Sequence, residues 1–230
     1  ESLLGDFMLA YKKDFGLHQL NVLGLAEAQK MITRGFYTTA TNFSTDRFGY
    51  DNLQAGAVRL WEGTGSYYEA PHLASFLGRV NYIYDGKYIA TVNARADASS
   101  KVGANNKWGF FPGVSAGWNM HRENFYKPLE AIVSRWKWRA SWGRTGNNNL
   151  SVANSRGEYK ITDTNYQGSV GILNTTLKNS QLRWETTESY DIGVDLGFFN
   201  NRLGLLIDYY NKLTFDRLYD EPLWSSTGFS

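Results

Sequence analysis

Hydrophobic and polar side chains alternate along much of this chain with a period of two residues. Over residues 87–97, one set is Tyr88, Ala90, Val92, Ala94 and Ala96, and the other is Ile89, Thr91, Asn93, Arg95 and Asp97. Successive side chains of a β-strand point to opposite faces of a sheet, so this pattern predicts a strand with one apolar face. Residues 75–84 alternate in the same way, and Asp85-Gly86 between the two segments suits a two-residue hairpin turn.

The same alternation recurs in six further segments. They are residues 4–11, 20–26, 110–120, 135–142, 189–196 and 203–210. Together with the hairpin around Asp85-Gly86, they predict about eight strands of roughly ten residues each. We therefore expect an all-β chain with an antiparallel, up-and-down sheet.

The connections between these segments alternate between short and long. Residues 12–16, 85–86 and 199–202 are short, whereas residues 29–72, 98–107 and 144–185 are long and polar. Tight turns at one end and long loops at the other are typical of outer-membrane barrels. We therefore expect the turns at Asp85-Gly86 and Asn200-Asn201 to lie at one end of the sheet, with the long connections at the other.

One connection breaks this regularity. Residues 121–134 stand where a short turn is expected. Leu129, Ile132 and Val133 have helical spacing, so we expect one short helix near residues 122–133.

The predicted strands carry charged side chains on one face and apolar or aromatic ones on the other. In a membrane barrel the charged set faces the lumen: Arg79, Arg95, Asp97, Arg139, Asp191, Asp195 and Asp208. The apolar set faces lipid: Tyr82, Tyr88, Trp138, Ile192 and Leu205. A strand of about 11 residues tilted by about 40° rises about 28 Å, close to the apolar band of such barrels. A soluble sandwich shows the same alternation, because alternation identifies which residues share a face and not what that face touches.

Composition excludes several classes of protein. Aromatic residues make up 16% of the 230 residues, too many for a disordered chain. The length suits one large domain or two small ones. Without cysteine there is no disulfide framework or thiolate metal site, and a net charge of +2 gives no reason to expect a nucleic-acid partner. No stretch approaches the roughly 20 apolar residues of a spanning helix, and we expect no signal peptide at the start of the chain.

Candidate catalytic and metal-binding groups are poorly arranged. His18, His72 and His121 have no ligand spacing, so we expect no metal site. Asp191 and Asp195 share a face of one strand about 13 Å apart, beyond the roughly 5–9.5 Å of a glycosidase pair. We therefore expect no enzyme and no cofactor. Sugar contacts are expected instead from aromatic residues of the long connections: Trp61, Tyr67, Tyr68 and Trp108.

Several segments resemble the SusC/RagA family of TonB-dependent outer-membrane transporters. Residues 75–125 are similar to the family's successive sequences G-R-x-x-Y-x-Y-x-x-K-Y, R-x-D-G-S-S and W-G-x-F-P-x-x-S-x-G-W. Residues 136–148 are similar to L-K-L-R-x-S-x-G-x-T-G-N, and residues 177–217 to L-x-W-E-x-T-x-x-x-x-I-G-x-D, closing on Y-Y-x-x-x-T. Ala98 stands where the family usually has glycine, and Lys101-Val102 where an aromatic residue is common. The resemblance covers most of residues 73–219, in the family's order.

This resemblance implies that residues 1–230 form one partial barrel domain without a plug, about eight strands of a transmembrane barrel of about 22. It implies a place in the Gram-negative outer membrane and a part in importing glycans or oligosaccharides, with peptides as the other cargo. The implied partners are a SusD-like surface lipoprotein, outer-membrane lipid, and the TonB–ExbB–ExbD complex, which would act through an N-terminal region absent here. The alternative is a soluble all-β carbohydrate-binding module.

We also expect that this chain does not close a barrel by itself. The predicted strand at residues 4–11 begins abruptly, and the one at residues 203–215 runs on into Asp220-Glu221-Pro222, which suits a loop. Closure requires the first and last strands to pair. The expected structure is an open, curved sheet with two unpaired edges.

Overall fold

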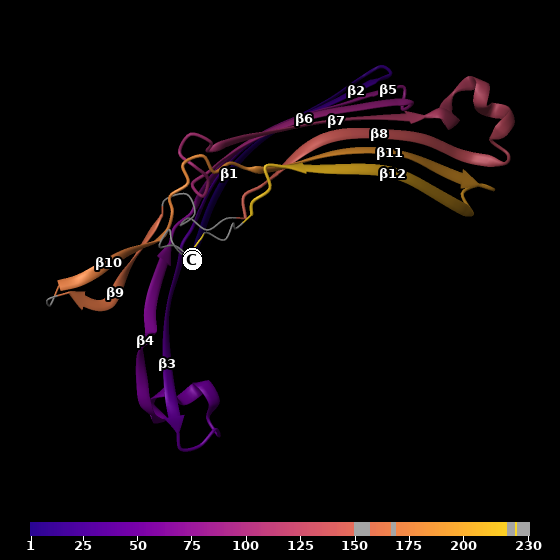
Figure 1. Cartoon of the computed structure of the whole chain (residues 1–230). Coiled ribbons are helices and arrows are strands. Elements are labelled where there is room, and N and C mark those ends of the chain that lie inside the picture. The colour runs from indigo at the N-terminus through magenta and orange to yellow at the C-terminus, as the bar shows by residue number, and fades with distance from the viewer. Residues whose placement is uncertain (150–156, 167–168, 220–223, 225–230) are drawn as a thin grey trace.

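The computed structural model consists of one large antiparallel sheet with two hairpins extending from it (Figure 1). It describes residues 1–149, 157–166, 169–219 and 224, and the side chains of these residues except 61, 62, 158–166 and 169–176. The sheet has eight strands in the order β1-β2-β5-β6-β7-β8-β11-β12. Their bounds are Ser2–Phe15, His18–Met31, His72–Tyr84, Tyr88–Ser99, Trp108–Asn119, Val133–Asn147, Glu185–Phe198 and Leu203–Phe215. The prediction of eight antiparallel strands is confirmed.

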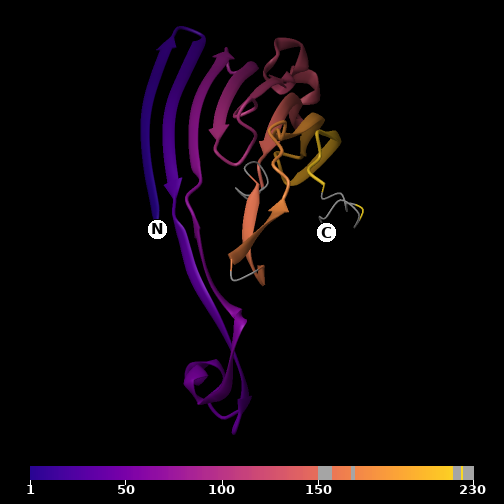
Figure 2. The same cartoon turned by 60° about the vertical axis from the view of Figure 1, so that its left-hand side comes forward.

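The two longest connections contain hairpins where the sequence predicted polar loops. One is formed by β3 (Thr33–Phe43) and β4 (Gly56–Glu69), and the other by β9 (Glu158–Tyr166) and β10 (Ser169–Thr176). The 3-10 helix η1 (Gly49–Ala55) joins β3 to β4. The threonine and aromatic residues of β3 and β4 favour extended backbone, and pairing satisfies backbone groups that a loop would leave to water. Figures 1 and 2 show the β3–β4 hairpin projecting far from the sheet.

The tight turns all lie at one end of the sheet, as predicted. Asp85 and Gly86 have φ angles of 50° and 60°, the left-handed values that a type I′ turn needs. The Asp85 N–H donates to the Leu17 carbonyl of the neighbouring turn (2.7 Å), and the Phe199 N–H donates to the Ile132 carbonyl (3.1 Å). The first turn lies at Gly16-Leu17 and not at residues 12–16, because the β1–β2 ladder continues to the pair Phe15–His18.

A short helix lies near residues 122–133, as predicted, but it is of the 3-10 type and ends before Ile132. The segment holds two 3-10 helices, η2 (Met120–Arg122) and η3 (Asn124–Leu129), and Val133 already begins β8. Tyr126 explains this local structure, since its fully buried side chain donates a hydrogen bond to the Val133 carbonyl (2.9 Å). Pro128 within η3 lacks the N–H that a continuing α-helix would use. Among the described residues, no helix is long and apolar enough to cross a membrane.

The sheet is open, as predicted. Strands β1 and β12 are its two edges and do not pair with each other. Every residue of β1 is exposed, and so is nearly every residue of β12. Residues 220–222, predicted to leave the last strand as a loop, lie outside the described part of the chain. Both edges therefore present unpaired backbone donors and acceptors.

The hydrophobic core is small and lies over one face of the sheet, near the hairpin end. Val102, Phe111 and Trp184 are its buried members, with Leu73, Leu182 and Leu218 packed around them. The β6–β7 loop reaches this core through a hydrogen bond from the Gly103 N–H to the Leu182 carbonyl (2.8 Å). The Trp184 indole donates to the Lys107 carbonyl (3.0 Å). The core thus fastens two chain connections onto the end of the sheet.

Gly146 provides a test of this packing. A Cβ at Gly146 would overlap the ring of Phe111, which is only 6% exposed, whereas a Cβ at Gly143 would come no closer than 3.5 Å to another atom. We expect Gly146→Ala to lower the free energy of unfolding by about 1–3 kcal/mol through overpacking. Gly143→Ala changes it by no more than about 0.5 kcal/mol. Urea titrations of the two variants check this, and equal midpoints would mean that the ring moves aside freely.

Candidate functional site

The predicted lumen-facing charges share one face of the sheet, which we call the polar face. The strand register shows this directly. Arg95 lies opposite Leu77 and Phe111, and Gly193 lies between Arg139 and Asp208. Because opposite residues of paired strands point to the same side, the alternation read from single strands is kept across the whole sheet. The remaining predicted members, Arg79, Asp97, Asp191 and Asp195, have registers that put them on the same face.

Arg139 is the centre of an ion-pair cluster that joins three strands. Its Nε lies 2.8 Å from Asp195 Oδ1, and its Nη2 lies 2.7 Å from Asp208 Oδ1. Arg135 approaches the other oxygen of Asp195 at 3.8 Å. Gly193 makes the cluster possible, since a Cβ there would overlap the Asp208 carboxylate and lie 2.9 Å from Arg139 Nη2. Asp195 is only 9% exposed, so this arginine compensates a desolvated carboxylate.

A second cluster lies nearer the hairpin end of the polar face. Arg95 Nε lies 2.8 Å from both carboxylate oxygens of Asp97, and Arg95 Nη2 donates to Ser75 Oγ at 3.0 Å. Ser75 and Asp97 are buried. Beside them is a pocket of about 440 Å³, whose lining includes Phe111 and Trp184 from the core. The polar face therefore has a hollow with both charged and aromatic walls near the hairpins.

Two of the predicted lumen charges stand outside these clusters. Arg79 and Asp191 lie on the polar face without an ion pair to any described residue. Their charges are available to solvent or to whatever fills the space in front of this face.

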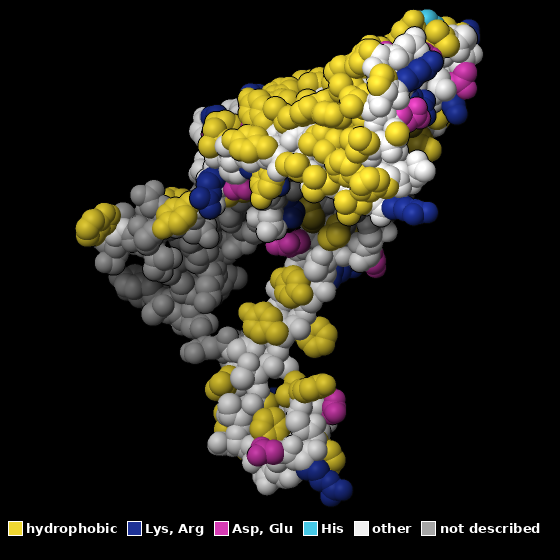
Figure 3. Space-filling view, turned by 90° about the vertical axis from the view of Figure 1, so that its right-hand side faces the viewer, with side chains coloured by type: hydrophobic (Ala, Val, Ile, Leu, Met, Phe, Trp, Pro, Cys, Tyr) yellow, Lys and Arg dark blue, Asp and Glu magenta, His cyan; other side chains and the backbone are white. Residues whose placement is uncertain are grey.

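The opposite face of the sheet is hydrophobic, and we call it the apolar face. Tyr82, Tyr88, Trp138, Ile192 and Leu205 all lie on it, as the alternation predicted. Val92 and Ile192 are each 55% exposed, so no part of the described chain covers them. Figure 3 shows a nearly continuous hydrophobic surface over the sheet, with charged side chains at its margins. An uncovered surface of this size requires an apolar environment or a partner.

Aromatic rings border this apolar face at the tight-turn end. Neighbouring ring centroids from Phe15 through His18, Tyr84 and Tyr88 to Trp118 lie 4.9–6.5 Å apart. At the other end Trp108 stacks on Phe76 at 6.0 Å. Trp108 and Trp118 lie ten residues apart on β7, about 33 Å along the strand, or about 25 Å after a tilt of about 40°. That height matches the apolar band of an outer-membrane barrel.

A family profile described as "TonB dependent receptor-like, beta-barrel" matches residues 5–229. The chain belongs to this family. TonB-dependent receptor P3 of Formosa agariphila is 41% identical over 231 residues, covering 99% of this chain and 23% of that protein. TonB-dependent receptor SusC of Bacteroides thetaiotaomicron is 32% identical over 232 residues, covering 96% of this chain and 22% of that protein.

Solved structures show the same fold. The structure of the RagAB peptide importer in its closed-closed state has a TM-score of 0.83 at 24% identity, covering 99% of this chain and 25% of the matched chain. The chain thus spans about a quarter of the length of these TonB-dependent receptors. Proteins of this family are outer-membrane β-barrels that act as transporters and receptors and not as enzymes. The soluble carbohydrate-binding module is not favoured, and the resemblance to the SusC/RagA family is confirmed.

The three predicted sugar contacts whose side chains the structure describes do not come together in one site of this TonB-dependent receptor. Tyr67 and Tyr68 lie within β4 and not in a loop, because that segment pairs with β3. Both are more than half exposed, and the Arg34 guanidinium lies 5.2 Å above the Tyr68 ring. Trp108 is the first residue of β7 and lies on the apolar face. Trp61 belongs to β4, and its side chain lies outside the described residues.

Two of the three histidines, His18 and His121, make side-chain contacts within the sheet and its turns. His18 belongs to the aromatic border, with its Nδ1 2.5 Å from the Tyr82 hydroxyl, and His121 Nδ1 lies 3.1 Å from the Trp136 carbonyl oxygen. The described residues contain no group of three or more histidine, cysteine, aspartate or glutamate side chains that could hold a metal ion.

Sequence reasoning missed a polar cluster at the tight-turn end. Tyr88 Oη and Trp118 Nε1 both donate to one oxygen of Glu123, at 2.6 and 3.2 Å. Lys87 lies 2.7 Å from Asp85 and 3.7 Å from Glu123. These contacts, led by the hydrogen bond from Tyr88, lower the pKa of the Glu123 carboxyl, and the bond to Asp85 raises the pKa of Lys87. No spacing in the sequence predicts this cluster, because the fold of the β7–β8 connection brings Glu123 to Tyr88.

We expect Arg139 to support the fold of the receptor through its two carboxylates. Arg139→Met leaves the buried Asp195 with only the distant Arg135, which lowers the free energy of unfolding by about 1–3 kcal/mol. Arg79→Met is the matched control, since this arginine forms no ion pair with a described residue, and it changes the free energy by about 0.5 kcal/mol or less. Urea unfolding of the full-length receptor in detergent measures both. Equal effects of the two variants contradict the assignment.

Stability should depend on the ionisation of Glu123. A carboxyl whose pKa is lowered by folding stabilises the folded state above its ordinary pKa of 4.5, and this stabilisation is lost as pH falls through the folded pKa. We therefore expect Glu123→Gln to be less stable than the unmodified receptor near neutral pH, with the two thermal midpoints converging at lower pH. Glu130→Gln, at an exposed position of the same connection whose side chain bonds to no described residue, serves as control. A constant difference at every pH would refute the assignment.

Proposed function

We propose that this chain forms part of the barrel wall of a TonB-dependent importer, with its apolar face against lipid and its polar face toward the lumen. The observation that carries the proposal is the division of the sheet into one uncovered hydrophobic face and one charged face. Arginine or lysine costs about 2–4 kcal/mol on the lipid face near the midplane. The reverse orientation would put Arg95 and Arg139 into hydrocarbon. Lumenal water instead solvates the charges that remain unpaired, such as Arg79 and Asp191.

The two ends of the sheet fit the two sides of the outer membrane. Outer-membrane barrels have short turns on the periplasmic side and longer extracellular loops. The turns at Asp85-Gly86 and Asn200-Asn201 therefore lie on the periplasmic side, and the β3–β4 and β9–β10 hairpins are extracellular. Trp108 and Trp118 then lie at the two membrane interfaces, where amphipathic rings are stable.

The cargo that we propose is a glycan or oligosaccharide, with a peptide as the other class. A SusD-like lipoprotein captures it on the cell surface, and the TonB–ExbB–ExbD complex supplies the energy from the periplasmic side. Tyr67 and Tyr68 are the cargo-contact candidates that remain accessible, since both rings are exposed on an extracellular hairpin. Exposed aromatic rings offer a sugar or peptide a flat apolar surface at little conformational cost. Trp61 keeps its place as a third candidate, whereas Trp108 faces the lipid interface in this orientation.

Uptake of labelled oligosaccharides and peptides by cells carrying the full-length receptor tests this function. We expect uptake that stops when the proton gradient is collapsed. Tyr67→Ala with Tyr68→Ala should weaken the apparent affinity about fivefold or more, since truncation of an aromatic anchor of a binding site costs more than about 1 kcal/mol. Tyr50→Ala, on the exposed tip of the same hairpin, is the control. Uptake that continues without the gradient would contradict the proposal, and unchanged affinity would exclude the two tyrosines from the contact.

A further inference from the structure

We propose that the extracellular end of the apolar face holds a binding site for a phosphorylated lipid of the membrane's outer leaflet. In this site Lys30, His72 and Lys107 contact the phosphate, and a groove of small side chains below them takes the acyl chains. The inference rests on the proposed function in one respect, namely that the apolar face contacts lipid.

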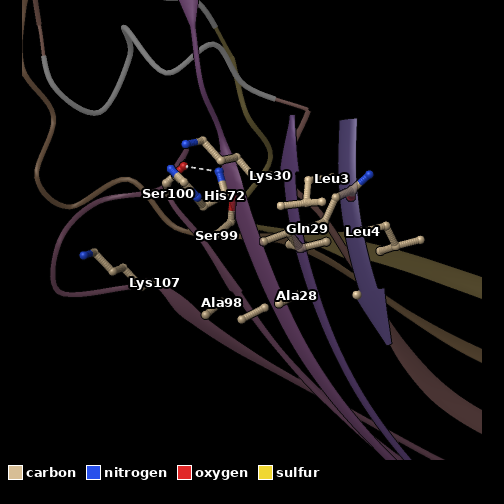
Figure 4. A pocket seen from close by; sticks show the side chains of 13 residues that line it. Leu3, Leu4, Ala28, Gln29, Lys30, His72, Ala98, Ser99, Ser100 and Lys107 are labelled. Carbon is tan, nitrogen blue, oxygen red and sulfur yellow. Dashed lines mark hydrogen bonds between the residues drawn. The ribbon is translucent and has the colours of Figure 1, made fainter. Parts of the chain in front are cut away.

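The site begins as a pocket of about 640 Å³ over strands β1, β2, β5 and β6 (Figure 4). Its floor is one cross-strand row of small residues: Gly5, Ala28, Ala74 and Ala98. The lining is mainly apolar, and the polar groups gather at the hairpin end, where Lys30 pairs directly with His72 in the ladder. An amphiphile with a polar head and apolar chains matches this separation of polar and apolar lining residues.

A second hollow of about 480 Å³ continues the groove toward the middle of the membrane. Gly24 and Gly78 face each other across β2 and β5 at its centre, and Phe7, Phe76 and Phe110 lie among its walls. A Cβ built on Gly24 or Gly78 would meet no atom within 4 Å. Packing within the chain therefore does not require these glycines, and the space in front of them is open to an outside molecule. From Lys30 to Gly24 the groove runs about 20 Å along β2.

The basic groups at the head of the groove have no acidic partner among the described residues. Lys30, His72 and Lys107 all line the pocket, and none of them forms an ion pair with a described side chain. A bound phosphate accepts hydrogen bonds from the lysine ammonium groups and from an imidazole N–H. Ser100, held by a hydrogen bond from the His72 N–H to its hydroxyl (2.9 Å), adds a polar group beside them.

The height of the site supports a lipid headgroup as its occupant. Ala98 in the pocket floor lies opposite Trp108, whose ring stacks on Phe76 at the border of the apolar band. The basic groups lie just beyond this border, at the level where headgroups meet the barrel. A further strand pairing with β1 would extend the sheet sideways and would leave the groove over β2, β5 and β6 uncovered.

Native mass spectrometry of the full-length receptor in detergent, titrated with phosphorylated lipid A, tests the proposal. We expect at least one lipid to remain bound, and Lys30→Gln with His72→Gln and Lys107→Gln to weaken binding tenfold or more. Lys13→Gln, a lysine at the opposite end of the apolar face, leaves binding unchanged. Because a Cβ at Gly78 meets no atom within 4 Å, Gly78→Leu extends into the open groove and weakens binding while keeping the headgroup contacts, so it separates lipid binding from misfolding.

Two probes identify the source of the phosphate. Dephosphorylated lipid A should bind at least tenfold more weakly than the phosphorylated form, and inorganic phosphate alone should not compete at equal concentration. Equal binding of both lipids, or competition by inorganic phosphate, overturns the proposal. So does equal binding by the triple variant.

A label attached to a single cysteine, introduced by Val92→Cys, separates this inference from the proposed function. Quenching of the label by lipid-phase quenchers is expected, because Val92 is exposed on the apolar face away from the basic groups. If Val92 is quenched and no lipid is retained, only the lipid site fails. If Val92 is not quenched, the proposed orientation of the wall fails as well.

Discussion

The structure depends on the continuous ladder of backbone hydrogen bonds that joins the eight strands. In a bilayer no water satisfies backbone groups, so each N–H and carbonyl within the membrane needs a partner in a neighbouring strand. The ladder also imposes the two-residue pleat on the whole sheet, because each residue points to the same side as its partner. One register shift by a single residue would turn Arg139 and Asp195 onto the apolar face and Trp138 onto the polar face. The open edges at β1 and β12 are the two places where this ladder needs further strands.

Glycine and arginine act together on the polar face. Gly193 leaves the space in which Arg139 reaches both Asp195 and Asp208, and Gly146 leaves the space that the Phe111 ring occupies. On the apolar face Gly24 and Gly78 leave space that no described residue fills. The same residue type thus accommodates neighbouring side chains on one face and forms an open groove on the other. Whether a neighbouring side chain fills the space in front of a glycine therefore distinguishes internal packing from a surface open to an outside molecule.

The two ends of the sheet differ in their construction, and the difference matches their proposed environments. At the tight-turn end, Glu123, Lys87 and Asp85 fasten the β7–β8 connection to the neighbouring turn through short polar contacts. At the other end, a small hydrophobic core around Trp184 holds the loops, and the β3–β4 hairpin projects beyond it with its aromatic side chains exposed. A compact turn end and an extended hairpin end suit a wall that meets cargo and a surface lipoprotein on its outer side.

Alternation by itself determined the number of main strands, the members of each face and the end at which the tight turns lie, because pleat and turn chemistry are local properties. It also predicted that Arg139, Asp195 and Asp208 share a face. Only the tertiary structure decided that these three residues touch, since their contact depends on the register of three strands and on the absence of a side chain at Gly193. The same holds for Tyr126, whose buried side chain bonds to the Val133 carbonyl, and for Glu123, which meets Tyr88 from a distant connection. The sequence pattern also did not predict the hairpins within the long loops. Their strands are stabilised by pairing with each other and not by a buried face, which would produce a two-residue hydrophobic period.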